Sequence, residues 1–371
     1  MTSSDALSPV RLRRALDAVP AYRPGKAPTV LEGVDAYKMS SNENPYPPLP
    51  SVIDVVRDAV TGMNRYPDAR MVPLRERIAD ACGVTADEVV TGAGSSGVLG
   101  QIMGAVVEEG DEVVYAWRSF ELYPILVSLA GARSVQVPLT ADARHDLSRM
   151  AGAVTASTSL VIVCSPNNPT GPAVRAAELE EFLARVPRDV MVVLDEAYLE
   201  FVVADDAPDA MALYRSHKNL VVLRTFSKAY GLAGLRIGYA IARPAIADAL
   251  RKAGLPFAVT TAGQEAAKAS LDARDELGVR VKEIVGERGR LVDGLREQGW
   301  DVPDTEANFV WVPLGADALA FVEAADAAGL SVRGFPREGV RVSVDVPEAN
   351  SRLLQVAAAF RAERADGPTA G

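Results

Sequence analysis

Residues 220–236 read Leu220-Val221-Val222-Leu223-Arg224-Thr225-Phe226-Ser227-Lys228-Ala229-Tyr230-Gly231-Leu232-Ala233-Gly234-Leu235-Arg236. The first four residues are apolar and rich in valine, which predicts a buried strand, and the polar residues after them predict a loop at its carboxyl end. In open α/β sheets, ligands bind just beyond the carboxyl ends of the strands. Lys228 therefore lies at a candidate ligand site, which is an unusual place for a solvated lysine.

Lys228 has the chemistry of a reactive amine in this position. A partly desolvated lysine has a lowered pKa and can attack a carbonyl to form a Schiff base, which is how lysine holds pyridoxal phosphate. Two hydroxyl groups, on Thr225 and Ser227, and the guanidinium of Arg236 could then bind the phosphate. Taken alone, the same stretch could equally be an ordinary loop followed by a surface arginine.

Composition indicates a globular protein with one large domain or two ordinary ones. The chain has 371 residues, of which 49% are hydrophobic. Its net charge is -10 and no block of lysine and arginine stands out, so we expect no nucleic-acid partner. Residues 1–10 lack the pattern of a signal peptide, and no run approaches the ~20 apolar residues of a membrane span. We therefore expect no membrane partner and a cytoplasmic location.

Cysteine and histidine are scarce. Cys82 and Cys164 are too few and too far apart for a disulfide framework or a thiolate zinc site, so we expect no metal. His145 and His217 both lie in polar, turn-like sequence. The chain therefore offers few candidates for the histidine base of a Ser-His-Asp mechanism.

Helices and strands are predicted to alternate along most of the chain. Residues 1–54 form an arm that is rich in proline at 41–50 and therefore extended. Helical patterns occur at 51–61, 73–82, 95–108, 121–130, 176–185, 264–298 (interrupted), 316–328 and 348–362, and strand patterns at 112–116, 133–137, 159–163, 190–194, 219–224, 308–313, 330–334 and 340–345. They predict an α/β fold, with a mostly parallel sheet sandwiched by helices in a large domain at 55–262 and a smaller α+β domain at 263–371.

Two further predicted strands are followed by polar loops. After residues 160–164 comes Ser165-Pro166-Asn167-Asn168-Pro169-Thr170-Gly171, in which the amide of Asn168 could donate to a phenolic oxygen. After residues 191–194 comes Asp195-Glu196-Ala197-Tyr198. Asp195 could pair with a protonated pyridine nitrogen, and Tyr198 could share the phenolic oxygen. Alone, the first loop could be a turn and the second a helix cap.

A fourth loop, Thr91-Gly92-Ala93-Gly94-Ser95-Ser96-Gly97, precedes a predicted helix. Small residues there leave backbone N–H groups free to bind an anion, although a glycine-rich turn without a ligand is commoner. All four loops lie at the same edge of the predicted sheet. Each supplies one part of a pyridoxal phosphate site, and their combination predicts that site.

These motifs together resemble those of a known family. Asn168-Pro169-Thr170-Gly171, Asp195-Glu196-Ala197-Tyr198 and Ser227-Lys228 with Arg236 are similar to the signature of fold-type I, aspartate-aminotransferase-like, pyridoxal-phosphate aminotransferases. Ser41-Asn42-Glu43-Asn44-Pro45, Arg65-Tyr66-Pro67-Asp68 and residues 227–236 resemble, more narrowly, the histidinol-phosphate aminotransferase group. The resemblance extends over about residues 20 to 360.

The resemblance implies a role for each matched residue. Lys228 would form the internal aldimine with pyridoxal 5'-phosphate and then carry a proton between the substrate Cα and the cofactor C4′. Asp195 would bind the pyridine nitrogen, and Tyr198 and Asn168 the phenolic oxygen. Phe120 would stack on the ring, and Tyr66 would reach the phosphate of the neighbouring subunit, which implies a homodimer with shared active sites. The residues matched to the phosphate are Ala93, Gly94, Ser95, Thr225, Ser227 and Arg236.

A second group of residues is implied to contact the substrate. Arg341 would pair with the substrate carboxylate or phosphate, and Arg333 is a second candidate for that pairing. The arm would close over the substrate, and apolar groups would surround its side chain. The residues in this group are Tyr22, Asn44, Tyr123, Arg333 and Arg341.

The likeness is closest to one branch of the group. Histidinol-phosphate enzymes usually carry an acidic or amide residue in the loop written here Gly92-Ala93-Gly94-Ser95-Ser96, and this chain departs from that pattern. The loop, with residues 117–124 and 44–52, is more similar to the aromatic-amino-acid (phenylalanine) aminotransferases. This implies transfer of the amino group of phenylalanine or tyrosine to 2-oxoglutarate. The alternative is a histidinol-phosphate aminotransferase of histidine biosynthesis.

Two alternative hypotheses place the protein in other functional classes. One is a pyridoxal-phosphate lyase or decarboxylase on the same fold, which would release CO2 without forming a keto acid. The other is a non-enzymatic regulator that borrows the fold. Such regulators resemble fusions to a DNA-binding helix-turn-helix, and we expect no room for one in residues 1–54.

Overall fold

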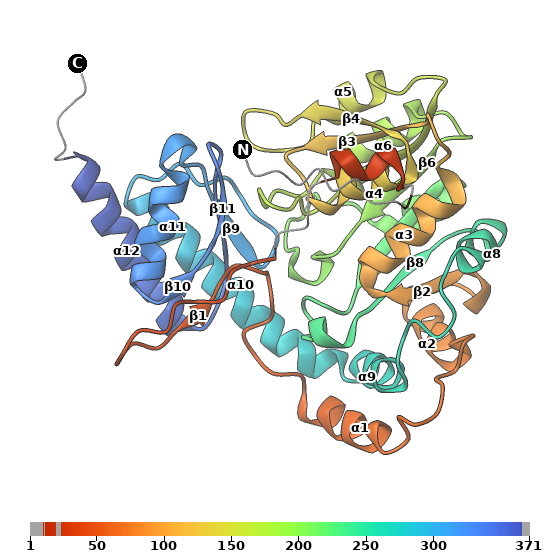
Figure 1. Cartoon of the computed structure of the whole chain (residues 1–371), viewed down its shortest axis with the longest axis horizontal. Coiled ribbons are helices and arrows are strands. Elements are labelled where there is room, and N and C mark those ends of the chain that lie inside the picture. The colour runs from red at the N-terminus through yellow and green to blue at the C-terminus, as the bar shows by residue number, and fades with distance from the viewer. Residues whose placement is uncertain (1–9, 11, 20–23, 366–371) are drawn as a thin grey trace.

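A seven-stranded sheet forms the larger part of the protein (Figure 1). The computed structural model describes residues 10, 12–19 and 24–365. The strand order is β2-β8-β7-β6-β5-β3-β4, and only β8 runs antiparallel to its neighbours. The strands are β2 (Val89–Ala93), β3 (Glu112–Trp117), β4 (Arg133–Pro138), β5 (Thr158–Cys164), β6 (Met191–Asp195), β7 (Leu220–Thr225) and β8 (Ile237–Ile241).

Both faces of this sheet are buried, because successive side chains of each strand point to opposite sides. In β6, Val192 and Leu194 join one hydrophobic core and Val193 joins the other. The first core is covered by α2 (Val72–Cys82), α5 (Leu147–Gly152), α6 (Ala176–Arg185), α7 (Ala210–Ser216) and α9 (Thr261–Asp272). The second is covered by α3 (Gly94–Val106), α4 (Leu122–Ala130) and α8 (Pro244–Lys252). The sheet is therefore the middle layer of a helix–sheet–helix sandwich.

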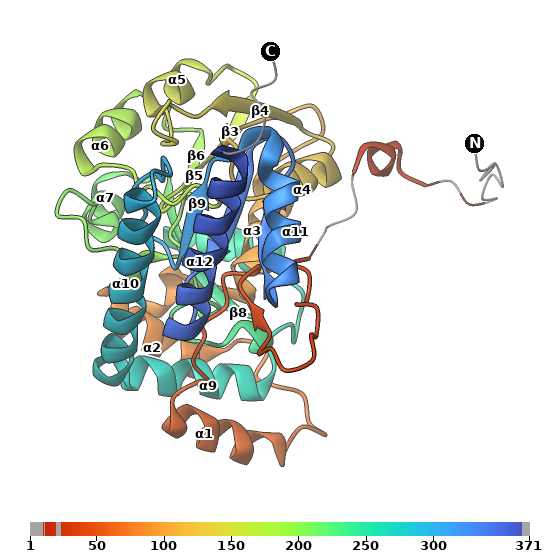
Figure 2. The ribbon, with the colours of Figure 1, turned by 90° about the vertical axis from the view of Figure 1, so that its left-hand side faces the viewer.

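The carboxyl-terminal part has its own sheet and core. Its antiparallel strands β9 (Phe309–Val312), β11 (Arg333–Phe335) and β12 (Gly339–Ser343) lie in the order β11-β12-β9. Three helices lie side by side over one face of it, namely α10 (Arg274–Glu297), α11 (Ala318–Ala327) and α12 (Pro347–Ala365) (Figure 2). Among the described residues, no helix has the length and apolar character needed to cross a membrane.

The amino-terminal arm is joined to this second part. The short strand β1 (Tyr37–Lys38) pairs in parallel with β10 (Leu330–Ser331), and α1 (Pro50–Val60) packs against α9. Residues close to the amino terminus therefore lie beside residues near the carboxyl terminus, as Figure 1 shows. The division into an arm, a large domain and a small domain at residues 54/55 and 262/263 stays a prediction.

Several elements are absent from the sequence prediction, and two of them matter for the site. The predicted strands omit β2 and β8, because each contains a glycine that weakens the strand pattern. Gly238 of β8 is needed for packing: a Cβ there would lie 2.1 Å from the Ser95 backbone nitrogen. A glycine at this position therefore lets the first turn of α3 lie directly against the sheet.

Candidate active site

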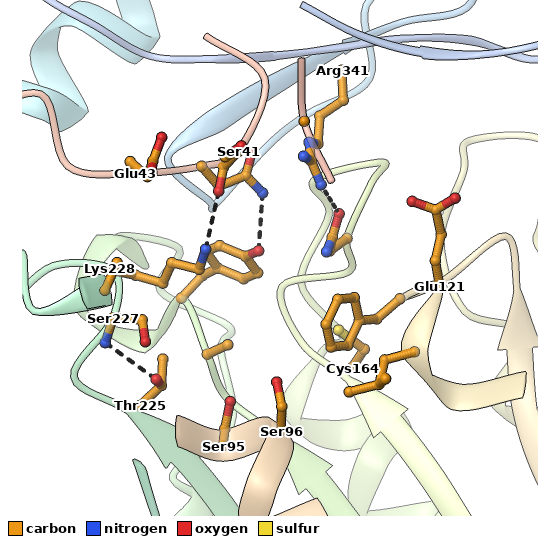
Figure 3. Close-up of a pocket in the computed structure, with 18 of the residues that line it drawn as sticks. Ser41, Glu43, Ser95, Ser96, Glu121, Cys164, Thr225, Ser227, Lys228 and Arg341 are labelled. Carbon is orange, nitrogen blue, oxygen red and sulfur yellow. Dashed lines mark hydrogen bonds between the residues drawn. The ribbon is translucent and has the colours of Figure 1, made fainter. Parts of the chain in front are cut away.

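A cavity of about 430 Å³ lies where the arm and β12 face the carboxyl ends of β5, β6 and β7 (Figure 3). Cys164, Asp195 and Thr225 are the last residues of those three strands, and all three line the cavity. The predicted site residues that line it are Ser95, Phe120, Asn168, Asp195, Tyr198, Thr225, Ser227, Lys228, Arg236, Arg333 and Arg341. The loops that the sequence separates by more than 200 residues therefore converge on one space.

Lys228 extends its amine into this cavity. The Nζ atom donates a hydrogen bond to the Ser41 carbonyl oxygen at 3.3 Å, and it lies 5.8 Å from the centre of the Tyr198 ring. Loss of water, together with the positive charges of Arg341 and Arg236, lowers the pKa of Lys228 to about 7, against the opposing charge of Glu43. A large fraction of the amine is therefore neutral, and nucleophilic, near neutral pH.

Asp195 is a buried carboxylate with one oxygen unsatisfied. Its side chain is 4% exposed, and the Tyr123 hydroxyl donates to Oδ2 at 2.7 Å. Among the described residues, Oδ1 has no hydrogen-bond partner. Burial raises the pKa of Asp195 to about 6, although the Tyr123 hydrogen bond acts in the opposite direction. A cationic donor in the cavity would satisfy Oδ1 and stabilise the charge.

Two further polar groups are fixed at the cavity wall. Asn42 Nδ2 donates to the Tyr198 hydroxyl oxygen at 2.9 Å, and burial raises the pKa of Tyr198 well above its ordinary value. Arg341 Nη1 donates to Asn168 Oδ1 at 2.5 Å, and its Nη2 donates to the Ser40 carbonyl oxygen at 2.8 Å. Because the Asn168 oxygen is occupied, its amide nitrogen is the group that this residue can offer as a donor.

A cradle of donors lies at the start of α3. Arg236 Nη1 donates to the Ser227 hydroxyl oxygen at 3.3 Å, and the Ser227 backbone N–H donates to the Thr225 hydroxyl oxygen at 3.1 Å. A Cβ at Gly94 would lie 2.3 Å from Arg236 Nη2, so glycine lets the guanidinium approach the helix start. Helix N-termini and arginine both favour anions. The cradle therefore suits a phosphate group.

Some predicted residues lie elsewhere. Tyr123 is fully buried behind Asp195 instead of lining the cavity, so the structure gives it the role of holding that carboxylate. Asn44 Nδ2 donates to the Ala229 carbonyl oxygen at 2.8 Å and is not part of the cavity wall. Tyr66 is 83% exposed and stacks on Phe257. Ala93 and Gly94 flank the cradle through their backbone, and Tyr22 lies outside the described residues.

The structure also adds residues that the sequence prediction lacks. Ser41 and Asn42 of the arm contact Lys228 and Tyr198, and Glu43 lines the cavity beside them. His145 was predicted to lie in a polar turn, but it is buried, with Nε2 3.0 Å from Asn167 Oδ1, and burial lowers its pKa to about 4. The motif at residues 41–45 was visible in the sequence, but nothing local shows which of its side chains point inward.

Comparison with known proteins agrees with this geometry. Residues 34–355 match the family described as aminotransferase class I and II. The chain belongs to this family. An aromatic amino acid aminotransferase from Streptomyces coelicolor is 55% identical to this aminotransferase over 353 residues, which is 95% of this chain and 98% of that protein. One from Thermobifida fusca is 52% identical over 352 residues, again 95% and 98% of the two chains.

Solved structures show the same fold. Histidinol-phosphate aminotransferase from Sinorhizobium meliloti, in complex with pyridoxal-5'-phosphate, is 30% identical, with a TM-score of 0.87 over 98% of this chain and 100% of that one. A Thermus thermophilus aspartate aminotransferase variant is 22% identical, with a TM-score of 0.79 over 94% and 99% of the two chains, and it shares the fold. The predicted aspartate-aminotransferase-like α/β fold and the predicted enzyme class, aminotransferase, are therefore confirmed.

The burial of Asp195 generates a prediction about stability. In the protein without cofactor, Asp195→Asn should raise the free energy of unfolding by about 3 kcal/mol at pH 8, because a carboxylate with a raised pKa resists ionisation in the folded state. The gain should shrink as the pH falls from about 6 towards 4, because the folded carboxyl becomes protonated while the unfolded one approaches its ordinary pKa of about 3.9. Urea denaturation between pH 4.5 and 8 measures it.

The exposed Asp58 on α1 supplies the control for this experiment. Asp58→Asn should change the free energy of unfolding by less than about 0.5 kcal/mol over the same range. If Asp195→Asn is no more stable than the wild type at pH 8, the Asp195 carboxylate is not penalised by burial.

Proposed function

We propose that this aminotransferase moves the amino group of an aromatic amino acid, phenylalanine or tyrosine, to 2-oxoglutarate, with pyridoxal 5'-phosphate attached to Lys228. The proposal is supported mainly by the groups that face the cavity. An amine with a pKa of about 7 and a buried carboxylate with an unsatisfied oxygen face the same cavity, with a phosphate cradle between β7 and α3. The aromatic amino acid aminotransferases that are 52–55% identical support the choice of substrate.

The residues present fit the proposed cofactor. Its positively charged pyridine nitrogen would be the cationic donor that Asp195 Oδ1 lacks among the described residues. Asn168 and Tyr198 would hold the phenolic oxygen, and the cradle of Ser95, Thr225, Ser227 and Arg236 would hold the phosphate. Phe120, which lines the cavity, would cover the ring. When bound, pyridoxal phosphate supplies an electron sink for the pair of electrons released when a substrate Cα–H bond breaks.

Side chains of the protein would transfer the protons and hold the cofactor in place. Lys228 would hold the cofactor and, once displaced by the substrate amine, would accept the Cα proton and later return one, which its lowered pKa permits near neutral pH. The Asp195 carboxylate would keep the pyridine nitrogen protonated, and Tyr123 would keep that carboxylate in place. The arm and the β11-β12-β9 sheet cover one side of the cavity and would limit the access of water.

Arg341 is the proposed anchor for the substrate. Its guanidinium lines the cavity, and its positive charge acts on the Lys228 amine, so a bidentate pair with the α-carboxylate would place Cα near that amine. Phenylalanine and 2-oxoglutarate both carry this carboxylate, so one cation can serve both half-reactions. The rings of Phe120 and Phe335 line the cavity and offer apolar surface to an aromatic side chain.

We further propose that two copies form a homodimer in the cytoplasm. Met63, Tyr66 and Leu255 are each at least 80% exposed, and the Tyr66 ring rests on Phe257. The Tyr66–Phe257 contact brings two exposed aromatic side chains together, and adjoining exposed apolar side chains are typical of an interaction surface. In the proposed dimer, Tyr66 of each subunit would reach the phosphate in the other subunit. Asn44, and Tyr22 outside the described residues, are proposed to close over the substrate.

Lys228→Ala should abolish transamination and the visible absorbance that a lysine-bound pyridoxal group gives, because the attaching amine is lost. Absorbance spectra of the purified variant and assays with phenylalanine and 2-oxoglutarate measure both effects. Lys252, an exposed lysine on α8 that pairs with Asp248, provides the matched control, and Lys252→Ala should leave both unchanged. Full turnover by Lys228→Ala would exclude the proposed mechanism.

A comparison of donors tests the substrate class. With 2-oxoglutarate as acceptor, kcat/KM for phenylalanine should exceed that for histidinol phosphate by tenfold or more, because histidinol phosphate has no carboxylate for Arg341 and adds a phosphate. Steady-state kinetics of the unmodified enzyme measure the ratio. A tenfold preference for histidinol phosphate, about 1.4 kcal/mol in transition-state binding, would establish the alternative, a histidinol-phosphate aminotransferase.

A further inference from the structure

Two arginines from facing strands reach the substrate cavity. Arg333 of β11 and Arg341 of β12 are direct partners in the antiparallel register, and both line the cavity. Side chains at such positions lie on the same face of a sheet, with Cβ atoms about 5 Å apart. The cavity therefore holds a second cation close to the one proposed to bind the α-carboxylate.

The second cation has an acidic partner. Arg333 Nη2 donates to Glu121 Oε2 at 2.8 Å. Glu121 also lines the cavity, directly after Phe120, whose ring is proposed to cover the cofactor. In Figure 3 its carboxylate stands on the side of the cavity opposite Lys228. The Arg333–Glu121 pair therefore borders the space that is left for the substrate side chain.

The charge of this pair determines which side chains the cavity favours. An uncharged ring can pack beside a neutral ion pair without breaking it. A phosphate carries about −1.5 to −2 charges near neutral pH, so it would have to draw Arg333 away from Glu121 and would still meet the Glu121 carboxylate, and like charges that lose water repel strongly. The single side-chain carboxylate of 2-oxoglutarate carries less charge and meets less of this repulsion. The pair is also partly shielded, with side-chain exposures of 15% for Arg333 and 35% for Glu121, so solvent screens it less than a fully exposed pair.

We propose that Glu121 is a specificity-determining residue, which neutralises Arg333 and so selects an amino donor with an uncharged aromatic side chain over one that carries a phosphate. This inference rests on the proposed aminotransferase function and adds the residue that rejects the alternative substrate class. Glu121 acts on the substrate partly through Arg333, so changing it should alter the choice between donors more than the rate with either one.

A neighbouring ion pair supplies a matched control. Arg118 Nε donates to Glu338 Oε2 at 2.8 Å, and this pair joins the same loop after β3 to the turn between β11 and β12. Neither Arg118 nor Glu338 lines the cavity. Loss of this pair would loosen the same contact between the two parts of the protein without changing the charge inside the cavity.

The test compares kcat/KM for histidinol phosphate and for phenylalanine in the wild type, Glu121→Gln and Glu338→Gln, all as cofactor-loaded enzymes with 2-oxoglutarate as acceptor. Because the reaction is expected to follow ping-pong kinetics, kcat/KM for each donor does not depend on the acceptor concentration. Glu121→Gln keeps the shape of the side chain and frees the charge of Arg333. It should raise the ratio of histidinol phosphate to phenylalanine tenfold or more, mainly through a lower KM for histidinol phosphate.

The controls separate charge from structure. Glu338→Gln should leave the ratio within about twofold of the wild type, and adding Arg333→Gln to Glu121→Gln should cancel the gain. Glu121→Ser, a second neutral replacement at this partly exposed position, should give the same increase if Glu121→Gln folds poorly. A ratio that stays within twofold of the wild type in both Glu121 variants overturns the inference while the proposed function stands. A wild-type preference for histidinol phosphate contradicts the proposed function itself.

Discussion

Desolvation of two ionisable groups at the ends of neighbouring strands governs the whole site. Lys228 follows β7 and Asp195 ends β6, and burial changes their pKa values in opposite directions, to about 7 and about 6. Burial disfavours the charged form of each group. A carbonyl that bonds to the neutral amine and a cation that pairs with the carboxylate would therefore both be bound favourably. The parallel sheet supplies the rigidity that keeps both groups there, because its two faces are packed by separate cores.

The arm completes this environment from the far end of the sequence. Its Asn42 is held between the second sheet and the cavity, since its backbone N–H donates to the Ser343 hydroxyl oxygen at 2.8 Å while its side chain donates to Tyr198. Asn308 Nδ2 donates in turn to the Asn42 carbonyl oxygen at 3.2 Å. The β11-β12-β9 sheet and the wall of the cavity are thus joined through the buried arm residue Asn42. Hydrogen bonds of this kind hold the arm against the cavity and exclude water from it.

The sequence predicted the parts of the site that follow strong local patterns. Apolar strands followed by polar residues located Asn168, Asp195 and Lys228, because the carboxyl ends of parallel strands meet at one edge. Local sequence patterns could not predict contacts between segments that are far apart in the chain. Asn42 meets a tyrosine 156 residues away, and the helix face that buries Tyr123 behind Asp195 depends on packing that no local signal records. The pairing of Arg333 with Glu121 likewise follows from the approach of two elements 212 residues apart.

The folded chain itself lowers the pKa of Lys228, and the pH dependence of amine labelling measures this effect. The cofactor-free protein would be treated with an amine-reactive reagent at a series of pH values from 5 to 11, and mass spectrometry would follow the peptide that contains Lys228. The labelling rate of Lys228 should be half-maximal near pH 7, well below the range of an ordinary lysine amine. A Lys228 labelling rate that keeps rising up to pH 10, as for an ordinary lysine amine, would contradict a lowered pKa.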